Sequence, residues 1–289
     1  MAETVLITGA SGGLGLEFAR IFASRGYNLI LAARSLDKLQ QIAAELSGDG
    51  ASPKGGSAST DGASPGDGSA SGDTVSSGVK SIHVDIIQAD LSQERGAEKL
   101  YTEVKALGRP VDQFVNNAGA GKAASTVDID PDELRGLIHL DVTSYAMLCR
   151  LIGADMVRQG HGKILNVSST TAFFPDPYFN IYGPSKAFVM SLTEAMRGEL
   201  RGTGVSVTAL CPGPVRTGWA ERAGQAYPAM AADPAKVAMT GFRAMQAGRL
   251  YTIPGVGTSV GTHLLSLLPR TLRVMIGVWW QSAMIRKGR

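Results

Sequence analysis

Residues 4–24 read TVLITGASGGLGLEFARIFAS, which places a short apolar run, a glycine-rich turn and an amphipathic pattern in direct succession. The run Thr4–Ile7 is typical of a buried strand, and the spacing of apolar side chains over Gly15–Ser24 is typical of a helix. Glycines in the turn let an anionic group approach the free amides at the start of that helix. The stretch therefore predicts a strand–turn–helix unit.

The turn itself does not match the usual dinucleotide-binding fingerprint. Gly9, Gly13 and Gly15 are spaced Gly-x3-Gly-x-Gly, whereas the fingerprint is Gly-x-Gly-x-x-Gly. On its own this spacing fits either a nucleotide site or a tight structural turn. Its position directly after the first predicted strand favours the nucleotide site.

The same alternation of short apolar runs and longer amphipathic runs continues along the chain. It predicts further strands at Asn28–Ala32, Ser81–Ile86, Gln113–Val115, Lys163–Val167 and Val205–Leu210. It predicts further helices at Leu36–Leu46, Glu94–Ala106, Pro131–Gln159 and Ser185–Arg201. Strands that alternate with helices indicate a parallel sheet with both faces covered. The predicted fold class is α/β: a doubly wound, Rossmann-type parallel sheet in three α/β/α layers, forming one domain over residues 1–261.

The composition is that of an ordinary globular protein. Of 289 residues 44% are hydrophobic and 18% charged, which excludes collagen-like, coiled-coil and wholly disordered chains. The net charge of +3 is too small to indicate nucleic-acid binding. Cys149 and Cys211 make neither a disulfide framework nor a metal-binding pattern, and no signal-peptide pattern opens the chain. We expect a cytoplasmic enzyme without a metal.

One segment departs from this composition. Residues 47–78 contain nine Gly and nine Ser, with Val75 as the only large apolar side chain, and Asp49–Pro53 recurs as Asp61–Pro65. So little apolar surface cannot offset the entropy of ordering the segment. It is predicted to be a disordered insertion; a functional tether is the alternative.

The second predicted strand ends in a basic residue. A domain selective for NAD usually has an acid here, which binds the ribose 2′-hydroxyl. In this chain Ala33 and Arg34 occupy the position. A guanidinium suits a 2′-phosphate, both by its charge and by its forked donors. The sequence therefore favours NADP(H); alternatively, Arg34 is a solvated surface charge.

Short motifs follow the other predicted strands. They are Asp90-Leu91, Asn116-Asn117-Ala118-Gly119, Ser169 with Tyr182-Gly-Pro-Ser-Lys186 thirteen residues later, and Cys211-Pro212-Gly213-Pro214-Val215-Arg216-Thr217. With these motifs, roughly residues 3–220 resemble the single-domain members of the short-chain dehydrogenase/reductase family. The resemblance implies an NADP(H)-dependent oxidoreductase that interconverts a ketone or aldehyde and an alcohol, often as a homo-oligomer.

The resemblance also implies which residues contact the cofactor. These are Gly9, Ser11, Gly13, Leu14 and Gly15 in the turn, Arg34, Asp90 and Leu91 toward the adenosine, and Asn117, Ala118, Gly119, Tyr182, Lys186, Pro212, Gly213, Val215 and Thr217.

The proposed chemistry of the Tyr-x3-Lys motif follows from its spacing. Tyr182 and Lys186 are four residues apart in a helical pattern, so they share one face. A free tyrosine has a pKa of about 10, and a neighbouring ammonium lowers it toward neutrality. Tyr182 would then act as general acid toward a carbonyl oxygen, and Ser169 would hydrogen-bond the same oxygen.

One position departs from the family pattern. Family members commonly carry an Asn in the helix after the Asn-Asn-Ala-Gly motif, where it supports a proton relay through the Lys. Here the matching position is Asp141. An ionised Asp accepts hydrogen bonds but donates none. Asp141 is a relay candidate, and a carboxylate beside Lys186 would favour the charged ammonium.

The substrate end of the sequence is less informative. Residues 219–230 and 251–257 are expected to cover the pocket, and Phe173, Phe174, Pro175 and Tyr178 are candidate walls or core residues. An apolar or extended carbonyl substrate fits these side chains.

The C-terminal segment is basic and apolar. Between Pro234 and Arg289 there are eight Lys or Arg and no Asp or Glu. Residues 262–289 are predicted to form one amphipathic helix, with Leu264, Leu268, Leu272, Met275 and Trp279 on one face. Arg270, Arg273 and Pro269 interrupt any membrane-spanning stretch. The helix packs on the domain or in an oligomer interface, lies on an anionic membrane surface, or is disordered.

Two other classes of function stay open from the sequence. A non-catalytic dinucleotide-sensing or scaffold protein would keep this fold without turnover, which Asp141 allows but the Ser169, Tyr182 and Lys186 set disfavours. A membrane-surface recruitment module would depend on residues 262–289.

Overall fold

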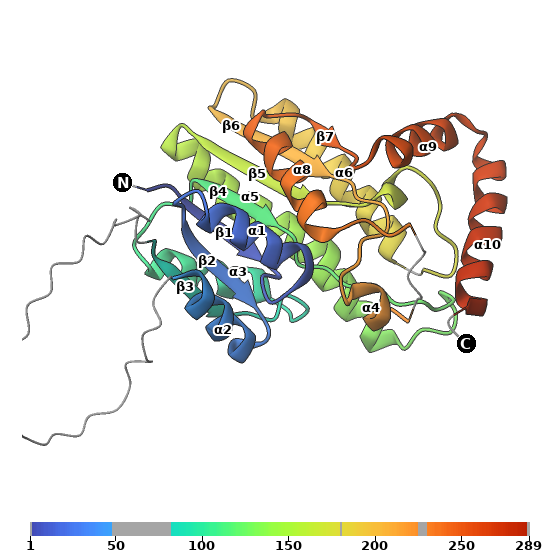
Figure 1. Ribbon diagram of the computed structural model, residues 1–289, viewed down its shortest axis with the longest axis horizontal. Helices are drawn as coiled ribbons and strands as arrows, with labels where there is room; N and C mark the ends of the chain where they lie inside the picture. Colours follow the sequence, from blue (N-terminus) through green and yellow to red (C-terminus); the bar gives the residue numbers. More distant parts are fainter. Residues whose placement is uncertain (1, 48–81, 180, 225–229, 288–289) are drawn as a thin grey trace, which may run out of the picture.

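The computed structural model describes residues 2–47, 82–179, 181–224 and 230–287 (Figure 1). The predicted disordered insertion at residues 47–78 therefore lies outside the described residues, except for Ser47. The described chain confirms the α/β class. Its sheet has seven strands in the order β3-β2-β1-β4-β5-β6-β7, all parallel.

The strands fall close to their predicted positions. They are β1 (Thr4–Thr8), β2 (Asn28–Ala33), β3 (Val84–Gln88), β4 (Gln113–Asn116), β5 (Gly162–Val167), β6 (Val205–Leu210) and the short edge strand β7 (Tyr251–Thr252). The sequence analysis missed β7, and it placed the third strand two to three residues early. β7 has only two residues, which form a strand because they pair with Ala209 and Leu210 of β6.

Helices cover both faces of the sheet. They are α1 (Gly13–Ala23), α2 (Leu36–Leu46), α3 (Gly96–Ala106), α4 (Pro131–Ile138), α5 (Ser144–Gln159), α6 (Tyr182–Glu199), α7 (Trp219–Arg222), α8 (Pro234–Gln246), α9 (Val256–Leu267) and α10 (Arg270–Lys287). Alternate residues of β1 enter different cores: Val5 and Ile7 pack with α1, α2 and α8, whereas Leu6 packs with α3 and α5. Burial on both faces explains why the strands read as continuous apolar runs.

Helix α8 was not predicted from the sequence, although it has a clear start signal. The Asp233 side chain accepts a hydrogen bond from the backbone N–H of Lys236, and Pro234 occupies the first turn. The helix packs against α1, where the rings of Phe22 and Phe242 meet edge-on at 5.1 Å. α8 therefore completes the core on that face of the sheet.

The predicted helix Pro131–Gln159 has a different winding at its centre. A π-helical segment, η1 (His139–Thr143), joins α4 to α5. π-segments insert an extra residue per turn and often redirect a side chain at a functional site. Here the redirected segment carries Asp141. By length and apolarity this run is also a candidate membrane span, but Leu148 and Ile152 lie buried against the sheet, which accounts for its apolar character.

The C-terminal segment differs from the single helix predicted over residues 262–289. The chain forms two helices, α9 and α10, and α9 already begins at Val256. Leu268 between them is extended, with φ −70° and ψ 150°. Pro269 explains the break, because a proline disfavours the helical conformation of the residue before it. Figure 1 shows α10 at one edge of the molecule, opposite α2 and β3.

The α1–α8 contact gives a test of this core. Phe22 is fully buried between Tyr27 and Phe242, so Phe22→Ala should lower the free energy of unfolding by about 3–5 kcal/mol. Urea denaturation measures the loss. Val127→Ala, at an exposed position, is the matched control and should change little; equal effects of the two substitutions would contradict the described packing.

Candidate active site

A cavity of about 1450 Å³ opens at the carboxyl ends of the strands. The chain doubles back between β1 and β4, which are neighbours in the sheet although β2 and β3 separate them in sequence. Such a switch point leaves a crevice in which open α/β sheets bind their ligands. The cavity runs from the turn after β1 and the end of β2, past β4 and β5, to α10.

The glycine turn after β1 forms one end of this cavity. Gly9 and Gly13 have φ of 68° and 56°, a region that favours glycine. A Cβ on Gly15 would lie 2.2 Å from the carbonyl oxygen of Gly9, so this glycine allows α1 to approach the turn. Gly15 does not line the cavity, whereas Gly9, Ser11, Gly13 and Leu14 do.

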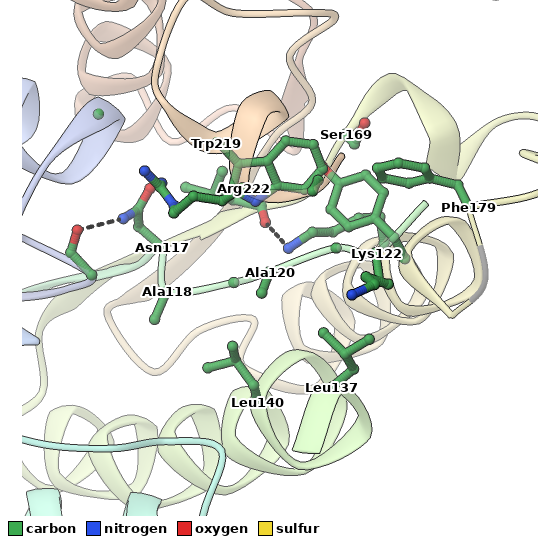
Figure 2. Close-up of a pocket in the computed structure, with 18 of the residues that line it drawn as sticks. Asn117, Ala118, Ala120, Lys122, Leu137, Leu140, Ser169, Phe179, Trp219 and Arg222 are labelled. Atoms are coloured by element: carbon green, nitrogen blue, oxygen red, sulfur yellow. Dashed lines mark hydrogen bonds between the residues drawn. The ribbon is translucent and has the colours of Figure 1, made fainter. Parts of the chain in front are cut away.

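Hydrogen bonds hold the ends of β1 and β4 together. The backbone amides of Asn117 and Ala118 donate to the Thr8 hydroxyl at 2.9 Å and 3.1 Å. The Asn117 side-chain amide donates to the Thr8 carbonyl at 2.9 Å. Figure 2 shows Asn117 and Ala118 side by side along one edge of the cavity. The two turns are thereby fixed relative to each other before any ligand binds.

Two cationic residues line the end of the cavity beside β2. Arg34, at the end of that strand, is exposed, and Lys38 follows one turn into α2. The Asp90 carboxylate is hydrogen-bonded within its own loop: it accepts from the Ser92 backbone amide at 3.0 Å and from the Ser92 hydroxyl at 2.6 Å. The sequence analysis missed Lys38, whose position four residues after Arg34 was the available signal.

Tyr182 and Ser169 meet on the other side of the cavity. Tyr182 begins α6 and is half-buried, and Ser169 lies two residues after the end of β5, directly before the short helix at Thr170–Ala172. Burial raises the pKa of Tyr182, while its hydrogen bond with Ser169 lowers that pKa. The sequence analysis expected Lys186 to bring this pKa below its usual value. In the structure burial outweighs the other effects, so the phenol keeps its proton at neutral pH.

Lys186 is buried beneath Tyr182. Its ammonium donates to the Val167 carbonyl at 3.2 Å and lies 4.9 Å and 5.5 Å from the ring centres of Tyr145 and Tyr182. Burial lowers the pKa of Lys186, and the Asp141 carboxylate raises it. The ammonium is thus held by one carbonyl, two aromatic faces and one nearby carboxylate.

Asp141 lies behind the cavity wall, fully buried. Its Oδ1 accepts from the Ala120 amide at 3.2 Å, and its Oδ2 has no hydrogen-bond partner among the residues that the structure describes. A Cβ on Gly119 would lie 2.8 Å from Oδ1 of Asp141 and 3.1 Å from Nζ of Lys186, so only glycine leaves room for both. Burial raises the pKa of Asp141 to about 6, although Lys186 opposes this rise.

An aromatic cluster closes the substrate end. The rings of Tyr182 and Trp219 are 4.7 Å apart, and those of Phe179 and Trp219 are 5.7 Å apart. Gly121 permits this approach, because a Cβ there would lie 2.9 Å from both Phe179 and Trp219. Figure 2 shows Trp219 and Phe179 on one side of the space, with Leu137 and Leu140 on the other.

The predicted substrate walls divide into two groups. Phe174 and Pro175 line the cavity, whereas Phe173 packs against Tyr251 and Tyr178 is exposed. The expectation that residues 251–257 cover the pocket is wrong, because this segment forms the edge strand β7 and the start of α9 and contributes no lining residue. From the other segment, Trp219, Ala220, Arg222 and Ala223 do line it; residues 225–229 are outside the described chain.

Most of the predicted site residues come together in this cavity. Besides the turn residues, the lining includes Arg34, Asp90, Leu91, Asn117, Ala118, Gly119, Ser169, Tyr182, Lys186, Pro212, Gly213, Val215 and Thr217. Gly15 and Asp141 lie behind the lining. Gly121, Phe179 and the α10 residues Arg273, Ile276 and Gly277 were missed, because their positions depend on tertiary packing.

Comparisons with known proteins show the family to which the chain belongs. A family model described as short chain dehydrogenase matches residues 3–61 and 68–228. The human 17-beta-hydroxysteroid dehydrogenase type 3 is 32% identical over 219 residues, which are 75% of this chain and 60% of that protein. The chain thus spans less than two thirds of that relative.

Two solved structures are also similar. The short-chain dehydrogenase from Sphingobium yanoikuyae in complex with NADPH has a TM-score of 0.73 and 27% identity, covering 93% of this chain and 97% of that one. The bulky-bulky ketone specific alcohol dehydrogenase from Comamonas testosteroni has a TM-score of 0.69 and 25% identity, covering 93% and 95%.

The buried carboxyl group predicts a pH-dependent stability. Folded Asp141 keeps its proton up to about pH 6, whereas its ordinary pKa is 3.8. The wild-type chain therefore loses roughly 1–2 kcal/mol of stability through this group between pH 5 and pH 8. Asp141→Asn lacks the titration, so its free energy of unfolding should rise relative to wild type over that interval.

Urea denaturation of both chains at pH 5 and pH 8 measures this difference. Asp37→Asn, which replaces an exposed carboxylate on α2, is the control and should differ from wild type equally at both pH values. A pH-independent difference for Asp141→Asn would show that this carboxyl group does not titrate in a buried site.

Proposed function

Because the chain belongs to the short-chain dehydrogenase/reductase family, we propose that this oxidoreductase uses NADP(H) to interconvert a ketone or aldehyde and the corresponding alcohol. The observation that carries the proposal is the convergence of Ser169, Tyr182 and Lys186 on one cavity with the glycine turn. A similar enzyme of known structure is in complex with NADPH, and another is specific for bulky ketones.

The residues of the cavity fit a dinucleotide phosphate. Gly9, Gly12 and Gly13 line the cavity at the start of α1, and nothing lies within 4 Å of the position that a Cβ on Gly12 would take, so a pyrophosphate could approach the helix there. Arg34 and Lys38 supply positive charge where the 2′-phosphate would lie, and Ala33 stands where an NAD-selective chain usually has an acid. When bound, the reduced nicotinamide supplies the hydride.

Tyr182 has the proton that the carbonyl oxygen requires. A phenol is protonated at neutral pH, which is the form a general acid needs. Ser169, hydrogen-bonded to the same hydroxyl, stabilises charge that develops on the substrate oxygen. The buried ammonium of Lys186 stabilises the phenolate that remains after the proton has been donated.

The shape of the substrate end supports an apolar substrate. Leu137, Leu140, Phe174, Phe179 and Trp219 line it. Lys122, which also lines the cavity, is paired with Glu133 at 3.1 Å. The predicted cytoplasmic localisation and homo-oligomeric state stay predictions.

Replacing the proton donor tests the mechanism. Tyr182→Phe should lower kcat for carbonyl reduction at least about 100-fold, because the general acid is lost. NADPH binding should stay near the wild-type value, since the ring and its contacts are kept. The assay follows NADPH consumption at 340 nm with ketones, aldehydes and 3-oxoacyl compounds.

Substantial turnover by the variant would remove Tyr182 from the mechanism. A wild-type chain that binds NADPH without consuming it would favour a non-catalytic dinucleotide-binding protein.

Cofactor preference depends on Arg34. Arg34→Asp should lower the ratio of kcat/KM for NADPH to kcat/KM for NADH by roughly 10- to 100-fold, because charged hydrogen bonds to the 2′-phosphate are lost. Arg150→Asp, an equal charge change at an exposed position outside the cavity, is the matched control. If both variants keep the wild-type ratio, Arg34 is a solvated surface charge.

A further inference from the structure

Helix α9 presents an exposed apolar stripe. Val256, Val260, Leu264 and Leu267 are between 53% and 83% exposed. Their spacing of four, four and three residues places them on one face of the helix. The opposite face, which includes the buried Thr262, packs on the domain. The stripe therefore has no partner within the part of the chain that the structure describes.

Helix α10 is divided lengthwise into two halves. The inner half packs on the domain: Arg273 donates to the Phe173 carbonyl at 3.1 Å, Gln281 donates to Asp176, and Ile276 and Gly277 line the cavity. A Cβ on Gly277 would lie 2.8 Å from the Pro175 carbonyl oxygen, so the helix and the loop are in close contact. These contacts confirm the packing alternative for one side of the C-terminal segment.

The outer half of α10 is apolar and exposed. Leu272, Met275 and Trp279 recur at three- and four-residue intervals and are 41%, 68% and 71% exposed. Val274 and Val278 extend this half and are also exposed. Large apolar side chains grouped in this way mark a surface that binds a partner or a membrane. We call the exposed apolar side chains of α9 and α10 the outer face.

The charge of α9 and α10 indicates which kind of partner the outer face binds. The sequence of α9 and α10 contains four Lys or Arg and no Asp or Glu, and one of the four, Arg273, belongs to the inner half. Arg270, at the start of α10, is exposed. In a two-fold symmetric dimer a surface meets its own copy, so basic residues would face basic residues without an acidic partner from this region. An anionic surface compensates the same charge.

We propose that the outer face binds the surface of a bilayer containing anionic lipids. Apolar side chains enter the boundary between headgroups and acyl chains, Trp279 occupies the interface that its ring favours, and the exposed Arg270 meets the headgroups. The helices lie on the membrane rather than across it, because Pro269 separates them and the inner half of α10 packs on its own domain. One side of α10 thus lines the cavity while the other contacts lipid.

Vesicle sedimentation of the full-length protein tests this surface. Wild type should pellet with vesicles of phosphatidylcholine and phosphatidylglycerol, pellet less with phosphatidylcholine alone, and be released by salt. The double variant Met275→Glu/Trp279→Glu should bind the mixed vesicles at least roughly tenfold more weakly, because two apolar side chains no longer enter the bilayer. Neither residue lines the cavity, so NADPH binding should be unchanged.

Val127→Glu is the control for each of the two substitutions, since it places one glutamate at an apolar residue that is 89% exposed outside these helices. It should bind vesicles as wild type does.

Failure of the wild type to pellet with anionic vesicles, or equal binding by the double variant, would overturn the proposal. So would equal binding to neutral vesicles. Light scattering of the free proteins distinguishes the alternative: an oligomer that the double variant dissociates, without vesicle binding by wild type, would make the outer face a contact between copies of this chain.

Discussion

The ammonium group of Lys186 is buried at the carboxyl end of the sheet, and its surroundings determine the arrangement of the site. A buried charge is costly unless carbonyl oxygens, aromatic faces or an opposite charge compensate it. Here the Val167 carbonyl, the rings of Tyr145 and Tyr182, and Asp141 provide that compensation. Each comes from a different element, so placing one ammonium group requires β5, η1, α5 and α6 to meet at one point.

That requirement explains two otherwise local features. The π-helical winding of η1 directs Asp141 inward beneath the turn after β4, where its carboxylate accepts from Ala120. Gly119 has no side chain because Asp141 and Lys186 occupy the space that a Cβ would need. The same glycine lines the cavity, so one small residue serves both the buried charges behind the wall and the ligand in front of it.

Much of this arrangement could be predicted from the sequence, because its motifs follow strands and the carboxyl ends of parallel strands meet at one edge. The order of Asn117, Ser169 and Tyr182 along the chain therefore sufficed to place them together. Two further features had a signal in the sequence but were missed. Asp233-Pro234 indicates the start of α8, and Pro269 indicates the break between α9 and α10. Other features depend on tertiary contacts: β7 exists through pairing with β6, and the cluster of Gly121, Phe179 and Trp219 joins three separate segments. Burial likewise reversed the expected direction of the Tyr182 pKa, which no spacing of residues could reveal.

The proposed function depends on the transfer of hydride from the nicotinamide ring to the carbonyl carbon of a substrate held beside the Tyr182 hydroxyl. The most direct test uses a ketone that the enzyme reduces and NADPH that carries deuterium at C4 of the nicotinamide, in the position from which hydride is transferred. Mass spectrometry of the product should show an alcohol with one deuterium on the former carbonyl carbon for each cofactor oxidised. An alcohol without deuterium, or cofactor oxidation without alcohol, would contradict the account.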